Sequence, residues 1–224
     1  MIRPALTMCI ALYITGCGGD SDSVQELLPE SELGGAPQVD IDFVNTASKP
    51  VDYFVKQSGG TETLFDTNAQ VASNNNSEVS RHSISWSSPT PITLDIGAWD
   101  TNSQSDTSES LEVILNRSDK LWAIAWLDND ELTLTTVRQQ PSSQEGKYSV
   151  RVFSHSDSRI QVISSVISAI EAKKGQITPY LTIENCSGEL FFAAESISLC
   201  NLDPGKSYLL VTDGEDLIMA AEEE

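Results

Sequence analysis

The chain has 224 residues, and its hydrophobic and charged fractions, 39% and 21%, are those of a globular protein rather than of a disordered or membrane-spanning one. It carries 13 basic and 33 acidic side chains, which give a net charge of −20. A surface of this sign repels the phosphate backbone and excludes counterion-driven binding of DNA or RNA. It also excludes an electrostatic hold on anionic lipid, so any membrane attachment has to be hydrophobic or covalent.

The N-terminal segment has the layout of a signal peptide. One basic residue, Arg3, precedes an apolar run over residues 5–14, and small residues then lead to Cys17. About ten residues at 1.5 Å rise cover roughly half of a bilayer core, which is too short for a transmembrane helix. The tetrad Ile-Thr-Gly-Cys at 14–17 resembles the lipobox of bacterial lipoproteins, whose cysteine is diacylated before cleavage. An ordinary cleaved signal with a chance cysteine is the alternative.

The lipobox resemblance implies that residues 1–16 are removed and that Cys17 carries two or three acyl chains, which hold the protein to the membrane. In such lipoproteins, an Asp directly after the acylated cysteine resembles a signal for retention in the inner membrane. This chain has Gly18 at that position, so the expected location is the outer membrane. The leaflet and the facing side are not encoded. Residues 17–37 are too polar to fold alone and are expected to form a flexible acidic tether. The acidic residues 222–224 are expected to be a solvated end.

Two cysteines remain for the folded body. Cys9 leaves with the signal and Cys17 is acylated, so Cys186 and Cys200 are the only pair in the expected mature chain. In an oxidising compartment they are expected to form a disulfide, whose loop of about 15 residues is worth roughly 3 kcal/mol. A metal site is the rival interpretation, but two thiols without a nearby His supply half of a tetrahedral shell. We expect no metal and no cofactor.

Alternation of apolar and polar residues predicts a mainly β body. Ile41 and Phe43, and then Val51, Tyr53 and Val55, keep the period of two that half-buried strands require. Turn residues separate further expected strands over 92–96, 111–115, 121–127, 132–137, 150–153, 180–183, 190–194, 197–200 and 208–212. This pattern is typical of an antiparallel sandwich.

Two stretches depart from this alternation. Four apolar residues between Ile163 and Ile170 have helical spacing and precede the Lys-Lys-Gly of 173–175, a typical helix end. They predict a short helix over about 164–174. Asn and Ser dominate residues 68–80, which are expected to form a loop.

The two halves of the body resemble each other in sequence. Five positions match with a constant offset and no gap, and Ile41, Phe43, Val44, Val51 and Tyr53 correspond to Val150, Val152, Phe153, Ile160 and Val162. Four later positions also match, and Trp126, Asp128, Leu132 and Leu134 correspond to Val211, Asp213, Leu217 and Met219. The sequence therefore predicts two tandem sandwich domains, 38–140 and 147–224, with the short helix in the second.

Residues around the linker resemble a known family. An alternating strand pair over 121–137 is followed by a Pro/Ser-rich linker and by Gly-Lys-Tyr-Ser-Val-Arg-Val-Phe at 146–153. This arrangement is similar to the tandem immunoglobulin-like domains of bacterial exported proteins that are grouped only as a domain of unknown function. The resemblance implies immunoglobulin-like sandwiches and an exported location, and no activity. The first copy departs from it, because Asp42 stands where the family usually has Arg.

Only His82 and His155 are candidates for a base at neutral pH. Both have serine neighbours, but serines are frequent here and adjacent residues of a strand point to opposite faces. Both are expected to be exposed turn histidines, so we expect no catalytic residues and no enzyme activity. Acidic turns at 128–131 and 213–216 offer oxygens for a calcium ion, but the regular loop spacing is absent and solvated turns are favoured.

Tryptophans provide the remaining candidate site, a surface on which a sugar ring stacks. Trp122 and Trp126 share one strand face, and burial is the favoured interpretation of such a stripe. Trp86 and Trp99 are the candidates for ligand-binding aromatics, and Trp99, in a polar stretch, is expected to be the more exposed.

These features predict a non-enzymatic lipoprotein of the outer membrane that acts as an interaction or structural module of the cell envelope. Its expected partners are the membrane, through the acyl chains on Cys17, and an envelope protein or a glycan. The alternative is a glycan-binding envelope protein that uses exposed aromatics.

Overall fold

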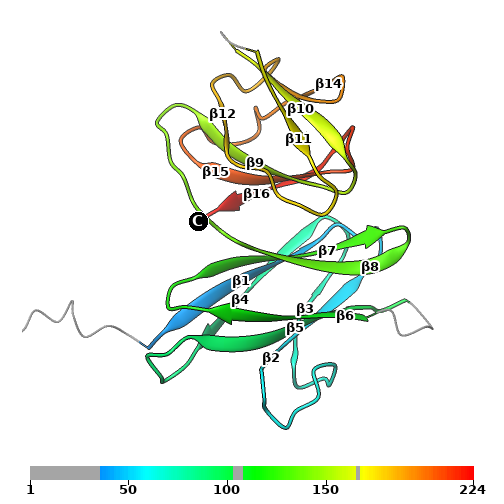
Figure 1. Ribbon diagram of the computed structural model, residues 1–224, viewed down its shortest axis with the longest axis vertical. Coiled ribbons are helices and arrows are strands. Elements are labelled where there is room, and N and C mark those ends of the chain that lie inside the picture. Colours follow the sequence, from blue (N-terminus) through cyan, green and yellow to red (C-terminus); the bar gives the residue numbers. More distant parts are fainter. Residues whose placement is uncertain (1–35, 103–107, 165–166) are drawn as a thin grey trace, which may run out of the picture. The chain divides into compact units, whose positions relative to one another are not determined.

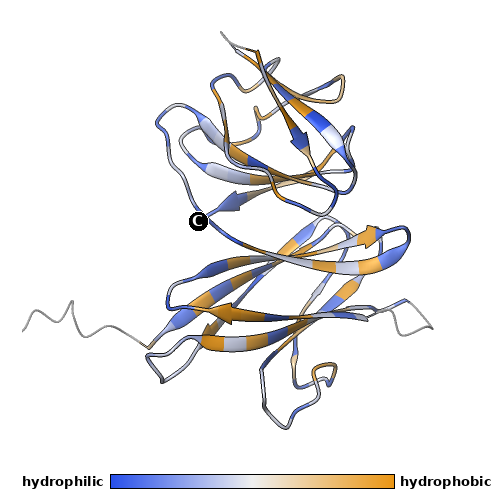
Figure 2. Cartoon of the chain, viewed as in Figure 1, coloured by the Kyte–Doolittle hydropathy of each residue, from blue (hydrophilic) through white to orange (hydrophobic). Residues whose placement is uncertain are grey.

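The computed structural model describes residues 36–102, 108–164 and 167–224, and all of them belong to one compact unit, Gly35–Glu224. The expected signal peptide, Cys17 and nearly all of the tether lie outside the described residues. The described ranges contain sixteen strands and no helix. The strands form four four-stranded sheets, which pair into two sandwiches (Figure 1). Hydrophobic and hydrophilic bands alternate along many of the strands, as their sequences predict (Figure 2).

The first sandwich contains eight strands. They are β1 (Gln38–Asn45), β2 (Val51–Gln57), β3 (Gln70–Asn74), β4 (Glu78–Ser85), β5 (Ile92–Asp100), β6 (Ser108–Leu115), β7 (Lys120–Asp128) and β8 (Glu131–Arg138). One sheet has the order β4-β1-β7-β8 and the other β3-β2-β5-β6. All neighbours are antiparallel except β1 and β7, which are parallel.

The second sandwich repeats this topology strand for strand. It contains β9 (Tyr148–Ser154), β10 (Ser158–Ile163), β11 (Ile167–Ala172), β12 (Leu181–Ile183), β13 (Leu190–Phe192), β14 (Glu195–Ile197), β15 (Ser207–Thr212) and β16 (Leu217–Glu223). Its sheets have the orders β12-β9-β15-β16 and β11-β10-β13-β14, and β9 and β15 are its parallel pair. The predicted tandem of immunoglobulin-like sandwiches is confirmed. The likeness is one of architecture and not of strand order. The first two strands of an immunoglobulin constant domain share a sheet, whereas β1 and β2 lie in different sheets here.

The internal repeat read from the sequence is present in the structure. The five matched pairs lie on β1 and β2 and on β9 and β10, and all ten side chains are at most 6% exposed. The β7–β8 and β15–β16 hairpins are also equivalent. Their register against the central strands differs by two residues from the sequence match, because Val44 pairs with Ile124 and Phe153 with Val211. A shift of two keeps every side chain on its face.

The predicted helix over 164–174 is wrong. Its described part, β11, is an edge strand that pairs with β10, and Ile167 lies opposite Ile163. Residues 165–166 are outside the described ranges. Ser, Ile and Val disfavour helix, and β10 supplies a pairing partner for Ile167–Ala172. Gly175 does not end a helix but has a φ of +68°, and its N–H donates to the Ser154 carbonyl at 2.8 Å.

The predicted loop over 68–80 is also wrong in part, because it contains β3 and the start of β4. Both are edge strands, whose outer residues can be polar because one side faces water. Asn74 is nevertheless buried. Its side-chain amide donates to the Phe43 backbone carbonyl at 3.0 Å, and its backbone carbonyl accepts from the Asn45 side-chain amide at 2.8 Å. The strand expected at 197–200 lies earlier, at β14.

The predicted disulfide between Cys186 and Cys200 is confirmed. Cys186 follows β12, in one sheet of the second sandwich, and Cys200 follows β14, in the other. Because β12, β13 and β14 have only three residues each, backbone pairing holds this part of the domain weakly. The disulfide supplies a covalent connection between the two sheets at that point.

Candidate functional site

A third hydrophobic core lies between the two sandwiches. Side chains of β7 alternate between two cores: Leu121, Ala123 and Ala125 face the interior of the first sandwich, and the other set faces the second sandwich. The shared core consists of Val44, Trp122, Ile124, Trp126, Phe153, Leu209 and Val211. The expected burial of the tryptophan stripe is confirmed, although the rings fill the junction between the domains and not a sandwich interior.

Equivalent positions of the two repeats meet in this junction. By strand register Val44 corresponds to Phe153, and Ile124 corresponds to Val211. All four belong to the shared core, so each domain contributes the same face of the same sheet. Figure 1 shows the β9–β15–β16 layer beside the layer that holds β1, β7 and β8.

A buried ion pair lies at the edge of this core. Arg151 is 4% exposed and Glu223 is 3% exposed, and the guanidinium donates to both carboxylate oxygens. The Trp122 indole N–H donates to Glu223 at 2.9 Å, and the Tyr180 hydroxyl also donates to that carboxylate. The expected solvated end at 222–224 is therefore wrong for Glu223, which completes the junction, whereas Glu224 is exposed. Burial, with the adjacent carboxylate, raises the pKa of Tyr180 above its ordinary range.

A second ion pair occupies the equivalent place in the first domain. Asp42, which matches Arg151 in the repeat, is 2% exposed and accepts two hydrogen bonds from Arg81, at 2.7 and 2.9 Å. Arg81 also pairs with Glu224, and these carboxylates raise its pKa above the ordinary value. The last two residues of the chain thus connect to both domains through opposite charges.

His155 lies at the same junction and is not the exposed turn histidine that the sequence suggests. Its Nε2 is 2.9 Å from the Thr46 hydroxyl, and its ring packs on Trp126 and Phe153. The Thr46 hydroxyl is within donating distance of the Ala125 carbonyl, so Nε2 is the donor toward Thr46. Burial lowers the pKa of His155 to about 4, so the ring is neutral at pH 7. An Nε2 that holds its proton cannot accept one from the hydroxyl, so this pair is structural.

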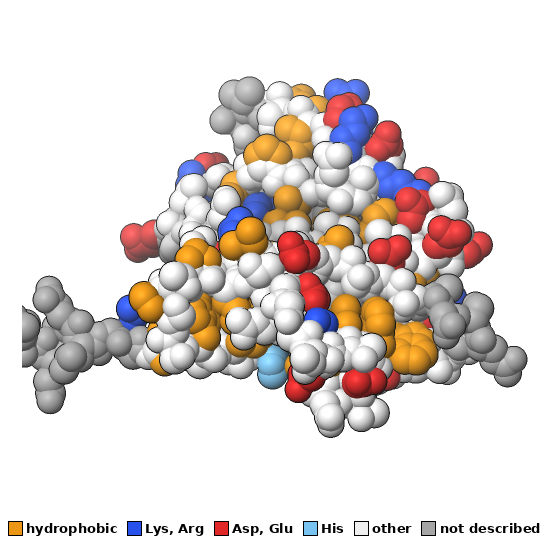
Figure 3. Space-filling model, turned by 60° about the horizontal axis from the view of Figure 1, so that its bottom comes forward, with side chains coloured by type: hydrophobic (Ala, Val, Ile, Leu, Met, Phe, Trp, Pro, Cys, Tyr) orange, Lys and Arg blue, Asp and Glu red, His pale blue; other side chains and the backbone are white. Residues whose placement is uncertain are grey.

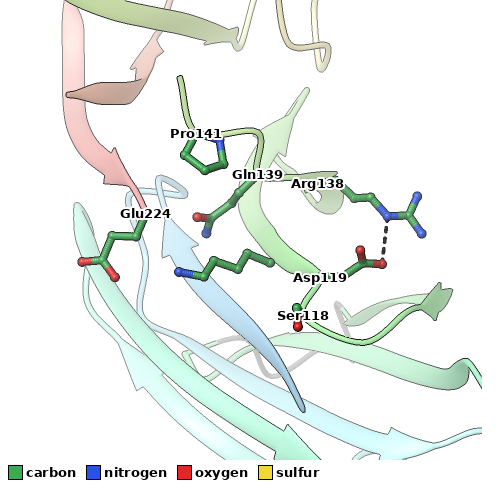
Figure 4. A pocket seen from close by; sticks show the side chains of 7 residues that line it. Ser118, Asp119, Arg138, Gln139, Pro141 and Glu224 are labelled. Carbon is green, nitrogen blue, oxygen red and sulfur yellow. Dashed lines mark hydrogen bonds and ion pairs between the residues drawn. The ribbon is translucent and has the colours of Figure 1, made fainter. Parts of the chain in front are cut away.

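A small polar pocket opens beside the linker, with a volume of about 190 Å³. It is lined by Ser118, Asp119, Lys120, Arg138, Gln139, Pro141 and Glu224. Figure 4 shows Arg138 paired with Asp119 at one end of the pocket, at 3.2 Å, away from Glu224. The Gln139 amide donates to Asp42, and its carbonyl oxygen is buried without a hydrogen-bond partner. Two of its lining residues, Gln139 and Glu224, bind the Asp42–Arg81 pair, so we assign this pocket to the junction.

A less polar notch of about 210 Å³ lies at the open edge of the first sandwich. It is lined by Val55, Lys56, Gln57, His82, Ile84, Ser85, Trp86, Ile92 and Leu94. Both Trp86 and His82 are half-buried here, and His82 lies within β4 rather than in an exposed turn. The sequence places Trp86 among the candidate ligand-binding residues but does not bring His82 to it.

The expectation that Trp99 lies in a polar loop is wrong. It lies near the end of β5, on the outer face of the first sandwich. Its ring is half-buried and packs against Phe54 and Phe65, with ring centroids 6.2 and 6.0 Å away. Phe65 comes from the segment before β3, which crosses this face over Gly97. A Cβ at Gly97 would lie 2.8 Å from the Phe65 ring, so glycine permits this contact. Trp99 therefore holds a crossing segment in place.

The acidic turns are held by the protein itself. Asp128 pairs with Lys174, and the Asp213 carboxylate accepts the backbone N–H groups of Glu215 and Asp216 at 3.0 and 2.8 Å. Within the described ranges, no three His, Cys, Asp or Glu side chains gather as a metal ion would require. On the face drawn in Figure 3, acidic side chains are scattered and apolar ones gather in groups among them. In the described part of the chain, no helix is long and apolar enough to cross a membrane.

Sequence reasoning predicted the burial of Trp122 and Trp126 but missed the ion pairs of the junction. Arg151 stands in a strand whose alternation places it opposite the sandwich core, but nothing in the pattern indicates what covers that face. Glu223 was missed because an acidic terminus is ordinarily solvated. The one signal was the continuous apolar run of β7 from Leu121 to Leu127, which is typical of a strand buried on both faces.

Comparison with known proteins adds no assignment to these sites. No model of a protein family matches the chain, and no curated protein is similar to it in sequence.

Proposed function

We propose that this protein is a lipoprotein of the bacterial outer membrane, anchored through acyl chains on Cys17, and that its two sandwiches act as a non-enzymatic interaction or structural module of the envelope. The lipobox-like tetrad at 14–17 supports the anchor, and the junction is the observation that carries the proposed role of the two sandwiches. A shared apolar core and a buried Arg151–Glu223 pair favour one fixed arrangement of the two domains. A body of this kind presents its surfaces to a partner in constant geometry.

The chemistry of the junction supports a binding or structural role. The His155 ring donates its hydrogen bond to the Thr46 hydroxyl, whereas a general base would accept one from it. The nearby carboxylates of Glu223 and Asp42 accept hydrogen bonds from Arg151 and Arg81, so they face these side chains rather than a substrate.

Replacement of Cys17 tests the anchor. In cells that express the Cys17→Ser chain, we expect the protein to leave the membrane fraction, because the thiol that receives the acyl chains is lost. Cys9→Ser is the matched control, since Cys9 lies in the expected signal peptide and should leave membrane fractionation unchanged. A Cys17→Ser protein that still sediments with membranes after a salt wash contradicts the proposal.

Glycan binding is the second candidate function, and the notch at Trp86 is the observation that favours it. The notch combines an aromatic ring with polar side chains in a space of about 210 Å³. The alternative does not need the acyl anchor, so the two proposals can fail separately.

A further inference from the structure

We propose that the notch formed by Trp86, His82, Gln57 and Ile84 binds a single pyranose ring at the end or side of a glycan. The inference deepens the second candidate function and does not depend on Cys17.

The notch exists because β3 covers only part of β2. Pairing between them runs from Val51 to Phe54, while β2 continues to Gln57. The segment before β3 crosses the outer face of the sheet, where Phe65 lies over Gly97. The edge of the sandwich is therefore open between the end of β2 and the end of β4, and the notch is lined from both strands.

Trp86 is held as a fixed platform in this opening. Its indole N–H donates to the Thr90 carbonyl at 2.8 Å, and its backbone N–H donates to the Pro37 carbonyl at 3.0 Å. Its ring packs on the core of the first sandwich and is half-buried. With its polar edge satisfied, the ring offers a flat apolar surface, which matches the apolar face of a pyranose.

His82 supplies the polar complement. Burial lowers its pKa below the ordinary value, so the imidazole is neutral at pH 7 and offers one donor and one acceptor. Among the described residues no hydrogen bond to its ring is found. The Gln57 amide adds donors and an acceptor at the rim. A neutral sugar, whose hydroxyl groups both donate and accept, suits this set.

The charge and the size of the notch restrict the range of ligands that it can bind. No Asp or Glu lines it, although the chain carries a net charge of −20, and its one cation, Lys56, pairs with Asp95 at 3.0 Å. A volume of about 210 Å³ lies below the range of roughly 300–1,000 Å³ that drug-sized ligands occupy, which leaves room for one ring.

The second domain shows that the fold does not require an aromatic here. Ile84 pairs with Val39 as Ile183 pairs with Tyr148, so the position equivalent to Trp86 is Asn185. There the Glu189 carboxylate closes the turn by accepting the Asn185 backbone N–H at 2.6 Å. Trp86 thus belongs to the first domain alone, as a ligand site would.

The test is an NMR titration of the full chain carrying Cys17→Ser, labelled with ¹⁵N. The probes are glucose, N-acetylglucosamine and their β-1,4-linked trisaccharides, with glycerol as a polyol control. We expect millimolar binding of at least one sugar, with shifts confined to the Trp86 indole and to residues 55–57, 82–86 and 92–94. Glycerol should leave these resonances unchanged.

Variants decide whether Trp86 carries the binding. Trp86→Leu keeps an apolar side chain on the core and should weaken the bound sugar about tenfold or more. Trp99→Leu is the matched control and should leave affinity unchanged, and circular dichroism checks the fold of both. The proposal is overturned if no sugar in the panel binds, if the shifts lie elsewhere, or if Trp86→Leu binds as tightly as the unsubstituted chain.

Discussion

Single buried side chains decide how the two domains meet. Gly175 lies against the Trp126 ring, and a Cβ there would come within 2.8 Å of it, in a conformation with φ of +68° that favours glycine. Thr46, from the first domain, accepts the hydrogen bond of His155, from the second. These contacts are specific in geometry, and each depends on one residue type.

His155 makes the stability of the protein depend on pH. Burial lowers its pKa in the folded chain from 6.5 to about 4, so between these values the unfolded chain binds the proton more readily. The stability that the neutral ring contributes is therefore fully present above pH 6.5 and is lost as the pH falls toward 4. We expect unfolding free energies from urea titrations to decrease over this interval.

His155→Gln should flatten that decrease, because glutamine does not titrate. His82→Gln is the control. Burial lowers the pKa of His82 as well, but His82 lines the notch and does not contact the junction. An equal decrease in the unsubstituted chain and in His155→Gln contradicts this account of the ring.

At the scale of elements, short strands explain where the second domain needs support. The disulfide between Cys186 and Cys200 joins the connections after β12 and β14 across the two sheets. Glu189, buried beside it, accepts the backbone N–H groups of Glu184 and Asn185 at 2.9 and 2.6 Å. A covalent and a polar closure thus replace the long backbone pairing found in the first domain.

Removal of both cysteines should destabilise the protein by about 3 kcal/mol, the chain-entropy value for a loop of this length. We expect the Cys186→Ser, Cys200→Ser double variant to unfold at lower urea concentration than the oxidised chain. Reduction of the unsubstituted chain should reproduce the shift. A double variant of unchanged stability would show that the short strands hold the second domain without the disulfide.

Sequence periodicity predicted most central strands and several edge strands, such as β6 and β8, but failed at the edge strands β3, β4 and β11. β7 and β9 are buried on both faces, and their apolar runs leave little alternative to strand. Ile163 ends β10, whereas Ile167 and Ile170 lie on the edge strand β11, so their helical spacing in the sequence is misleading and only pairing with β10 settles the conformation of β11. β3 and β4 are polar because they are edges, so alternation alone could not separate them from a loop.

The candidate site was predictable only in part for a related reason. Trp86 stands out as a residue type, but its partner His82 comes from the strand before it and the rest of the notch comes from β2 and β5. Trp99 looked exposed because its neighbours in sequence are polar, whereas Phe54 and Phe65 approach it from distant positions. Local patterns in a single sequence do not indicate which distant segments will be in contact.

Over the whole described unit, two like domains join through the same face, as identical subunits do in an isologous dimer. Opposite charges at one repeat position, Asp42 and Arg151, distinguish the two copies. Each of these charges is paired within its own domain, Asp42 with Arg81 and Arg151 with Glu223.

Glu223 is the residue on which this junction depends most. Glu223→Ala leaves Arg151 buried without its partner and should destabilise the protein by about 3–5 kcal/mol. Glu222→Ala is the matched control, because its exposed pair with Lys206 should contribute at most about 1 kcal/mol. Urea denaturation measures both, and equal losses would contradict the assigned role of the C-terminal residues.

The attachment of this two-domain body to a membrane is tested most directly by mass spectrometry of the protein purified from its native envelope. The account predicts a chain that begins at Cys17 and whose N-terminal peptide carries two or three acyl chains. A chain that retains Met1, or one that begins near residue 17 without acyl groups, contradicts it.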